Sequence, residues 1–180
     1  LSDKEIDKEM DFIKKNKNKI AAIGEVGIDF KEDLENWERQ KEIFEKFINL
    51  SIELNKPVIV HSRKAEKECI EILEEMKAKK VIMHCFSGKF SLAERITKNE
   101  WFLSIPANVN YNEQFQNIAE NIEINNLLCE TDAPYLHPLR RHDNEPSNVI
   151  FSYKKIAELK EMKLKDVEKK IEENYNKLFN

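Results

Sequence analysis

The sequence predicts an α/β protein in which short apolar strands alternate with amphipathic helices. Apolar runs such as residues 58–60 and 127–129 have the length of buried parallel strands and are too short for helices. Stretches with apolar residues three and four positions apart lie between these runs, which is typical of βα units. Several runs end in a histidine or a carboxylate, and α/β proteins gather their ligands at the carboxyl ends of parallel strands.

The chain is predicted to begin with a helix over residues 2–17, in which Ser2 and Glu5 form a capping box. An apolar strand over residues 19–30 follows and contains Glu25. The next helix, 36–54, carries aromatic side chains on roughly one side, and we expect these to be core contacts. Further helices are predicted at 65–77, 90–98, 114–123, 148–160 and 164–178, and further strands at 58–60, 81–83, 101–106 and 127–129.

Length and composition predict one globular domain over residues 1–180. With 41% hydrophobic and 36% charged residues, the chain can form a sizeable core beneath a heavily charged surface. The formal net charge is −4, which argues against a broadly basic surface for nucleic acid. A phosphate-bearing partner would therefore need local cations or a bound metal ion.

The three cysteines predict neither a disulfide framework nor a structural zinc site, because they are odd in number and lack CxxC spacing. We therefore expect a reduced, cytoplasmic protein. No apolar run approaches the length of a membrane span or of a signal peptide, so no membrane partner is predicted. The chain begins with a leucine inside a helical pattern, which suggests that the native N-terminus lies further upstream.

Four chemically active residues occupy equivalent positions near strand ends. Glu25 lies in an apolar strand between Gly24 and Gly27, His61 and His84 each follow an apolar triplet, and Asp132 follows the run 127–129. Each has an ordinary alternative: a buried pair of Glu25 with a lysine, core histidines, and a turn capped by Asp132. One shared metal site explains the repeated position better, because imidazole and carboxylate are common ligands of divalent ions.

Five segments carry a resemblance to a known family: 24–29 (GEVGID), 57–63 (PVIVHSR), 84–88 (HCFSG), 130–136 (ETDAPYL) and 144–148 (NEPSN). Their order and spacing resemble the TatD family of metal-dependent deoxyribonucleases, from about residue 21 to residue 179. The resemblance implies a TIM-like (β/α) barrel with a divalent metal centre at the carboxyl ends of its strands.

The resemblance also implies roles for individual residues. Glu25 would be a metal ligand able to bridge two ions, and His61 and His84 would hold the second ion. Asp132 would bind the first ion and orient or deprotonate the attacking water. Glu130 would support the site without binding metal. The implied cofactor is one or two divalent ions, with Mg, Mn and Zn all admitted by this set of ligands.

The chain departs from the family at its beginning. Members of the family open with a strand bearing His-x-His-x-Asp, and no such motif is present among the four histidines of this sequence. The expected fold is therefore a barrel that lacks its first strands. Because an incomplete barrel would expose apolar strand edges, we expect the active protein to have an additional N-terminal segment.

The function implied is hydrolysis of DNA phosphodiester bonds by metal-activated water, on single strands or DNA ends, with no obligate protein partner. Residues 137–146 form a charged loop that is predicted to face the substrate, the alternative being a solvated segment. Candidate phosphate contacts are Arg63, Ser87 with Gly88, Arg140 and Arg141, against surface salt bridges as the alternative. Two other functions stay open: a deacylase of the amidohydrolase type, acting for example on aminoacyl-tRNA, and a non-catalytic barrel domain.

Overall fold

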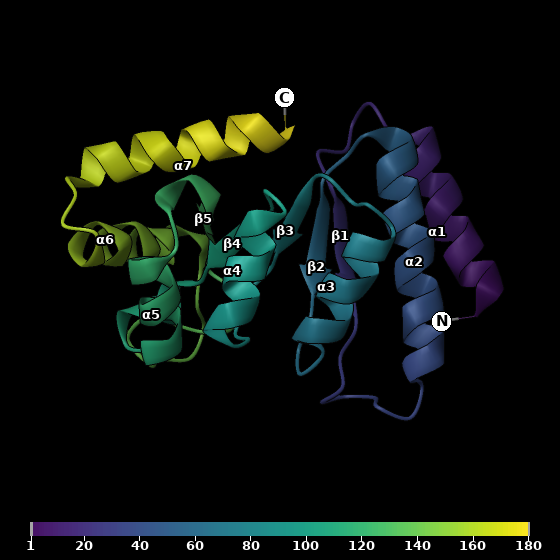
Figure 1. Cartoon of the computed structure of the whole chain (residues 1–180), viewed down its shortest axis with the longest axis horizontal. Helices are drawn as coiled ribbons and strands as arrows, with labels where there is room; N and C mark the ends of the chain where they lie inside the picture. Colours follow the sequence, from purple (N-terminus) through teal and green to yellow (C-terminus); the bar gives the residue numbers. More distant parts are fainter. Residues whose placement is uncertain (1, 180) are drawn as a thin grey trace. The chain divides into compact units, whose positions relative to one another are not determined.

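The computed structural model describes residues 2–179 and has an α/β fold with a parallel sheet of five strands, in the order β1-β2-β3-β4-β5. Figure 1 shows strands and helices following one another along the chain, as the sequence predicts. The strands are β1 (Ile23–Gly27), β2 (Val58–His61), β3 (Val81–Met83), β4 (Phe102–Ile105) and β5 (Leu127–Cys129). The α-helices are α1 (Asp3–Lys15), α2 (Trp37–Leu54), α3 (Glu66–Glu75), α4 (Phe90–Lys98), α5 (Glu113–Asn121), α6 (Val149–Leu159) and α7 (Leu164–Phe179).

The order and type of the predicted elements are confirmed, and the main differences lie at their ends. The strand predicted over residues 19–30 is shorter, because β1 spans only Ile23–Gly27. Short 3-10 turns follow β4 at Ala107–Asn110 and precede α6 at Pro146–Asn148. Among the described helices, none combines the length and the apolar character needed to cross a membrane.

The chain divides into two compact units, one formed by residues 2–82 with Phe179 and the other by Met83–Leu178. Each unit is described by itself below. The prediction of a single domain over residues 1–180 stays a prediction.

The first unit is built on the packing of α1 and α2 against β1. Figure 1 shows α1 (purple) and α2 (blue) side by side. Ile6 of α1, Ile23 of β1, and Phe47 and Leu50 of α2 form one buried cluster. The predicted capping box is present. The Ser2 hydroxyl accepts from the backbone N–H of Glu5, and the backbone N–H of Ser2 donates to the Glu5 carboxylate. The first turn of α1 is thereby fixed, while the buried cluster holds the helix against α2 and β1.

Gly27 allows β1 to approach the end of β2 closely. It pairs with His61 in the parallel ladder and has a φ of 151°, which side chains rarely adopt. A Cβ at this position would lie 1.8 Å from the backbone oxygen of His61. A glycine is therefore required where the backbone of β1 passes the candidate ligand His61.

In the second unit, helices α6 and α7 hold the end of β5 through polar side chains. Asn174 of α7 is 5% exposed, and its Nδ2 donates to the carbonyl oxygens of Ile124 and Leu127, each at 2.7 Å. Ser152 of α6 is fully buried and donates to the carbonyl oxygen of Glu130 at 3.2 Å. These bonds fix the backbone on both sides of β5, from which the candidate ligand Asp132 follows.

We expect the change Asn174→Ala to lower the free energy of unfolding by about 1–3 kcal/mol, because two buried carbonyl groups lose their donor. Thermal and urea unfolding, followed by circular dichroism, measure this effect. Glu172→Ala changes an exposed residue of the same helix and serves as the control. Equal stability of the two variants would show that Asn174 does not anchor β5.

Candidate metal centre

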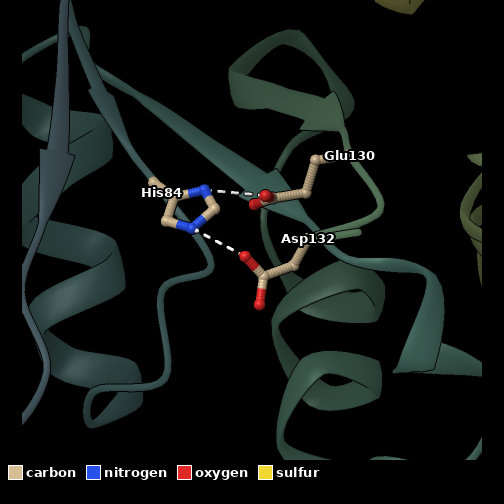
Figure 2. Close-up of side chains that lie close together, drawn as sticks. All are labelled: His84, Glu130 and Asp132. Atoms are coloured by element: carbon tan, nitrogen blue, oxygen red, sulfur yellow. Dashed lines mark ion pairs between the residues drawn. The ribbon is translucent and has the colours of Figure 1, made fainter. Parts of the chain in front are cut away.

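The second unit brings His84, Glu130 and Asp132 together at the carboxyl ends of β3 and β5. His84 follows β3 directly, and the two acids lie in the segment after β5. Figure 2 shows the imidazole of His84 facing both carboxylates, with one carboxylate at each ring nitrogen. Its Nδ1 lies 2.7 Å from Glu130 Oε2, and its Nε2 lies 3.3 Å from Asp132 Oδ1. The three side chains are partly buried, and each offers a ligand atom within 4.8 Å of the others.

The backbone around these residues is turned by left-handed conformations. Cys85, next to His84, has a φ of 44°, and Asp132 has a φ of 55°. Non-glycine residues adopt this region uncommonly, Asp more readily than most, and it permits the sharp change of direction after each strand. The Tyr135 backbone N–H donates to the carbonyl of Asp132 at 2.8 Å and closes the turn that contains Pro134. Asp132 therefore lies in a closed turn, from which its carboxylate faces His84.

Glu130 is held by partners other than His84. Its Oε1 accepts from the Ser104 hydroxyl at 2.5 Å and from the Cys85 backbone N–H at 2.8 Å. Its Oε2 faces Nδ1 of His84, within hydrogen-bonding distance. The two ring nitrogens of His84 point in different directions. An ion bound at Nε2 therefore lies too far away to be bound by the Glu130 carboxylate, which is hydrogen-bonded to Nδ1. Glu130 therefore orients His84, and the sequence prediction of a supporting role agrees with this geometry.

The donor pair of His84 and Asp132 fits a divalent ion. Two ligand atoms about 2.1 Å from one ion lie about 3.4 Å apart at the tetrahedral angle. The separation of His84 Nε2 and Asp132 Oδ1 is 3.3 Å, close to this value. Imidazole nitrogen with carboxylate oxygen suits zinc, manganese and related ions.

The first unit brings Glu25 and His61 together. Nδ1 of His61 lies 4.0 Å from Glu25 Oε2, and two ligands of one ion can be separated by at most about 4.2 Å. Nε2 of His61 lies 2.9 Å from Asp29 Oδ2. The Glu25 side chain is 50% exposed, so the alternative of a buried pair with a lysine is wrong. Glu25 lies in the middle of β1, and its side chain reaches the surface of the described structure.

Asp29 is a carboxylate of the first unit with several hydrogen-bond partners. Its Oδ1 accepts from the backbone N–H groups of Lys31 and Glu32, and its Oδ2 accepts from Arg63 Nε. Burial alone would raise the pKa of Asp29, but the hydrogen bonds from Arg63, His61 and the two backbone groups hold it well below its ordinary value near 3.8. The side chain is therefore an anion that accepts hydrogen bonds.

The four predicted ligands thus fall into two pairs. Glu25 lies with His61 in the first unit, and His84 lies with Asp132 in the second. Within each pair the histidine and the carboxylate face one another. The assignment of His61 and His84 to one ion and of Asp132 to another stays a prediction. That all four surround common ions stays a prediction.

The candidate phosphate contacts have varied surroundings. Arg63 pairs with Asp29 at 2.7 Å and with Glu32 at 2.6 Å. Ser87 is exposed, and its carbonyl accepts from Gln114 Nε2. Arg140 and Arg141 are exposed, and the guanidinium of Arg140 lies 4.3 Å from the centre of the Tyr111 ring. Contact of these residues with a phosphate stays a prediction.

Three supporting residues of the site were not identified from the sequence: Asp29, Ser104 and Asn144. Asn144 is 6% exposed and donates to the carbonyls of Thr131 and Tyr135, so it fixes the backbone on both sides of Asp132. The sequence offered a signal for Ser104, which is a polar residue inside the apolar strand predicted at 101–106. Asp29 and Asn144 lie in the family-like segments 24–29 and 144–148, which singled them out. The sequence did not indicate which residues they would contact.

A parallel α/β fold with histidine and carboxylate side chains at its strand ends defines a class, the metal-dependent hydrolases of the TIM-barrel type. The sequence model of the family described as "TatD related DNase" matches residues 2–180. The chain therefore belongs to the TatD family, as its motifs predicted.

Named relatives are similar over almost the whole chain. It is 40% identical over 177 residues to an uncharacterized metal-dependent hydrolase, MJ1582, of Methanocaldococcus jannaschii, covering 98% of this chain and 70% of the relative. It is 34% identical over 180 residues to human deoxyribonuclease TATDN3, covering 98% of this chain and 66% of the relative. The chain thus spans about two thirds of the length of these relatives.

Solved structures confirm the fold. The TatD homologue YJJV of Escherichia coli matches with a TM-score of 0.93 at 23% identity, over 100% of this chain and 71% of that one. A TatD family hydrolase of Entamoeba histolytica matches with a TM-score of 0.86 at 22% identity, over 97% and 68%. The likeness supports the prediction of a TIM-like (β/α) fold.

We expect Glu130→Gln to weaken binding of Zn²⁺ or Mn²⁺ about 10–100-fold, because the amide no longer holds His84 as the carboxylate does. Titration calorimetry of the metal-free protein measures the affinity. Glu113→Gln, an exposed change in the first turn of α5, is the control. Unchanged affinity in the Glu130 variant, with the fold intact, would argue against its orienting role.

Proposed function

We propose that the protein is a metal-dependent deoxyribonuclease that hydrolyses phosphodiester bonds of DNA, on single strands or at ends. The observation that carries the proposal is the cluster of His84, Glu130 and Asp132 in a chain of the TatD family. The name of the human relative, a deoxyribonuclease, supports DNA as the substrate.

His84 through Nε2 and Asp132 through its carboxylate would hold a divalent ion, and Glu25 and His61 are the further ligands proposed. The ion is Mg, Mn or Zn, and one or two ions can be bound by such residues. In sites of this kind, the ion supplies Lewis acidity toward the phosphate and makes water more acidic. The protein supplies fixed ligands, because Glu130 and its partners hold His84 before any ion binds.

Asp132 is the proposed proton acceptor. Figure 2 shows one of its carboxylate oxygens toward His84 and the other pointing away from the imidazole. The second oxygen, Oδ2, takes a proton from the attacking water as the water oxygen forms its bond to phosphorus. The ester P–O bond breaks in the same displacement, and the leaving oxygen takes up a proton from solvent. The side chain is 29% exposed, so water can reach it.

Glu25→Gln and Asp132→Asn are expected to abolish hydrolysis, because each replaces a proposed metal ligand with a neutral amide of the same shape. The measurement is cleavage of labelled single-stranded DNA in Mg²⁺ or Mn²⁺, with and without a chelator. Parallel reactions contain p-nitrophenyl esters and aminoacyl-tRNA. Wild-type protein should cleave the DNA only when the ion is present.

Circular dichroism of the variants provides the control for folding. Full metal-dependent DNA cleavage by either variant would refute the role assigned to that residue. Hydrolysis of the esters or of aminoacyl-tRNA without cleavage of DNA would instead favour the deacylase, and no hydrolysis of any substrate would favour a binding domain.

Arg140 and Arg141 are the proposed contacts to the phosphate backbone. They are exposed and follow Asp132 within one loop, in a protein whose net charge is −4. Local cations are needed on such a surface to attract a polyanion.

We expect Arg140→Ala and Arg141→Ala each to raise KM for DNA several-fold and to reduce its dependence on salt, with kcat little changed. Steady-state kinetics at several salt concentrations measure both quantities. Lys165→Ala removes an exposed cation at the start of α7 and is the matched control. An equal, small effect of all three changes would mean that the loop does not contact the substrate.

A further inference from the structure

His61 lies between two carboxylates that contact opposite sides of its ring. Nε2 is 2.9 Å from Asp29 Oδ2, and Nδ1 is 4.0 Å from Glu25 Oε2. The first distance is that of a hydrogen bond, and the second is too long for one. His61 is therefore bonded to Asp29, and its other nitrogen faces the proposed metal ligand Glu25.

The carboxylate of Asp29 is fixed by donors on both oxygens. Two backbone N–H groups, from Lys31 and Glu32, bond to Oδ1 at 2.9 and 3.0 Å, and Arg63 Nε donates to Oδ2 at 2.9 Å. The backbone of Asp29 is fixed as well, because its N–H donates to the Gln40 side chain of α2 at 2.7 Å. Only 16% of the Asp29 side chain is exposed, so water competes little for these bonds.

The two segments that carry these groups are also tied together through their backbones. Ile28 N–H donates to the carbonyl of His61 at 3.1 Å, and Phe30 N–H donates to the carbonyl of Arg63 at 3.0 Å. Asp29 lies between these two bonds. The segments that follow β1 and β2 are therefore hydrogen-bonded to each other on both sides of Asp29. This pairing sets the position of the Asp29 carboxylate relative to His61 and Arg63.

The bond to Asp29 determines which nitrogen of His61 carries the proton. An ionised carboxylate only accepts hydrogen bonds, so Nε2 must be the donor. In the neutral ring, Nδ1 then has the lone pair, and it faces Glu25. A histidine binds a metal ion through its unprotonated nitrogen, and the partner of the other nitrogen sets this choice.

Arg63 completes the arrangement. Its guanidinium reaches Asp29 through both Nε and Nη2, and Nη2 also contacts Glu32 at 2.6 Å. The carboxylates of Asp29 and Glu32 thus both form ion pairs with the Arg63 guanidinium. This contact gives Arg63 a task that differs from the phosphate contact predicted from the sequence.

We propose that Asp29 and Arg63 are positioning residues that fix the ring of His61 with Nδ1 directed toward the metal ion. The proposal rests on the proposed metal-dependent function, and it deepens that function by assigning a task to two residues that touch neither substrate nor ion. The pair of Glu130 and Ser104 stands in the same relation to His84, although there the carboxylate contacts Nδ1 and leaves Nε2 for the ion.

The experiment measures the histidine rings of the full chain by ¹⁵N NMR, without metal and at a pH where imidazole is neutral. In the wild-type protein, His61 should carry its proton on Nε2. Asp29→Asn should convert His61 to a mixture of the two tautomers, because the amide cannot accept from all of the surrounding donors. Arg63→Gln should shift the ring signals in the same direction, and Arg63→Lys should restore them in part.

The second readout is affinity for Mn²⁺ or Zn²⁺, measured by titration with the metal alone. Asp29→Asn and Arg63→Gln should each weaken binding about 10–100-fold. Glu32→Gln is the matched control, because it removes the other carboxylate from Arg63 and leaves Asp29 in place. It should change neither the tautomer nor the affinity.

A proton on Nδ1 of His61 in the wild-type protein would overturn the proposal without any variant. An unchanged ring and unchanged metal affinity in Arg63→Gln, with a raised KM for DNA, would overturn it in favour of a phosphate contact. Neither NMR nor metal titration uses DNA, so these results are independent of the nuclease assay. If DNA is not cleaved, the proposal that DNA is the substrate is wrong. The tautomer of His61 still tests whether Asp29 positions the ring.

Discussion

The contact between an imidazole and a partly buried carboxylate is the interaction on which each of the two candidate ligand pairs depends. Glu130 contacts Nδ1 of His84, and Asp29 contacts Nε2 of His61. Because imidazole has two nitrogens, fixing one by a hydrogen bond leaves the other available at a defined position. A metal ion would then meet ligands that need little reorganisation, and less of its binding free energy would be lost in ordering them.

The fold supports these contacts through elements distant in the sequence. Ser104 of β4 and the backbone of Cys85 hold the carboxylate of Glu130, and Ser152 of α6 holds its backbone. Asn174 of α7 fixes β5 itself. Three buried polar residues of the second unit, Ser104, Ser152 and Asn174, thus bond to β5 or to Glu130, which follows it.

The sequence predicted the succession of strands and helices because apolar periodicity and caps are local signals. It also predicted that histidines and acids would lie at the strand ends. It did not predict the two pairs that the structure shows, Glu25 with His61 and His84 with Asp132. The supporting residues were harder to predict, because Ser104 and Asn144 acquire their roles only when segments far apart in the chain meet. Glu25 illustrates another limit of pattern reasoning: it lies in the middle of an apolar strand, yet its side chain is half exposed.

The most direct test of the account is ¹¹³Cd²⁺ binding to ¹⁵N-histidine-labelled protein, observed by NMR. A one-bond ¹¹³Cd–¹⁵N coupling identifies the nitrogen that binds the ion. The account predicts this coupling at Nε2 of His84, while Nδ1 keeps its proton beside Glu130. A coupling at Nδ1, or the absence of any coupling to His84 when the ion is bound, would contradict it.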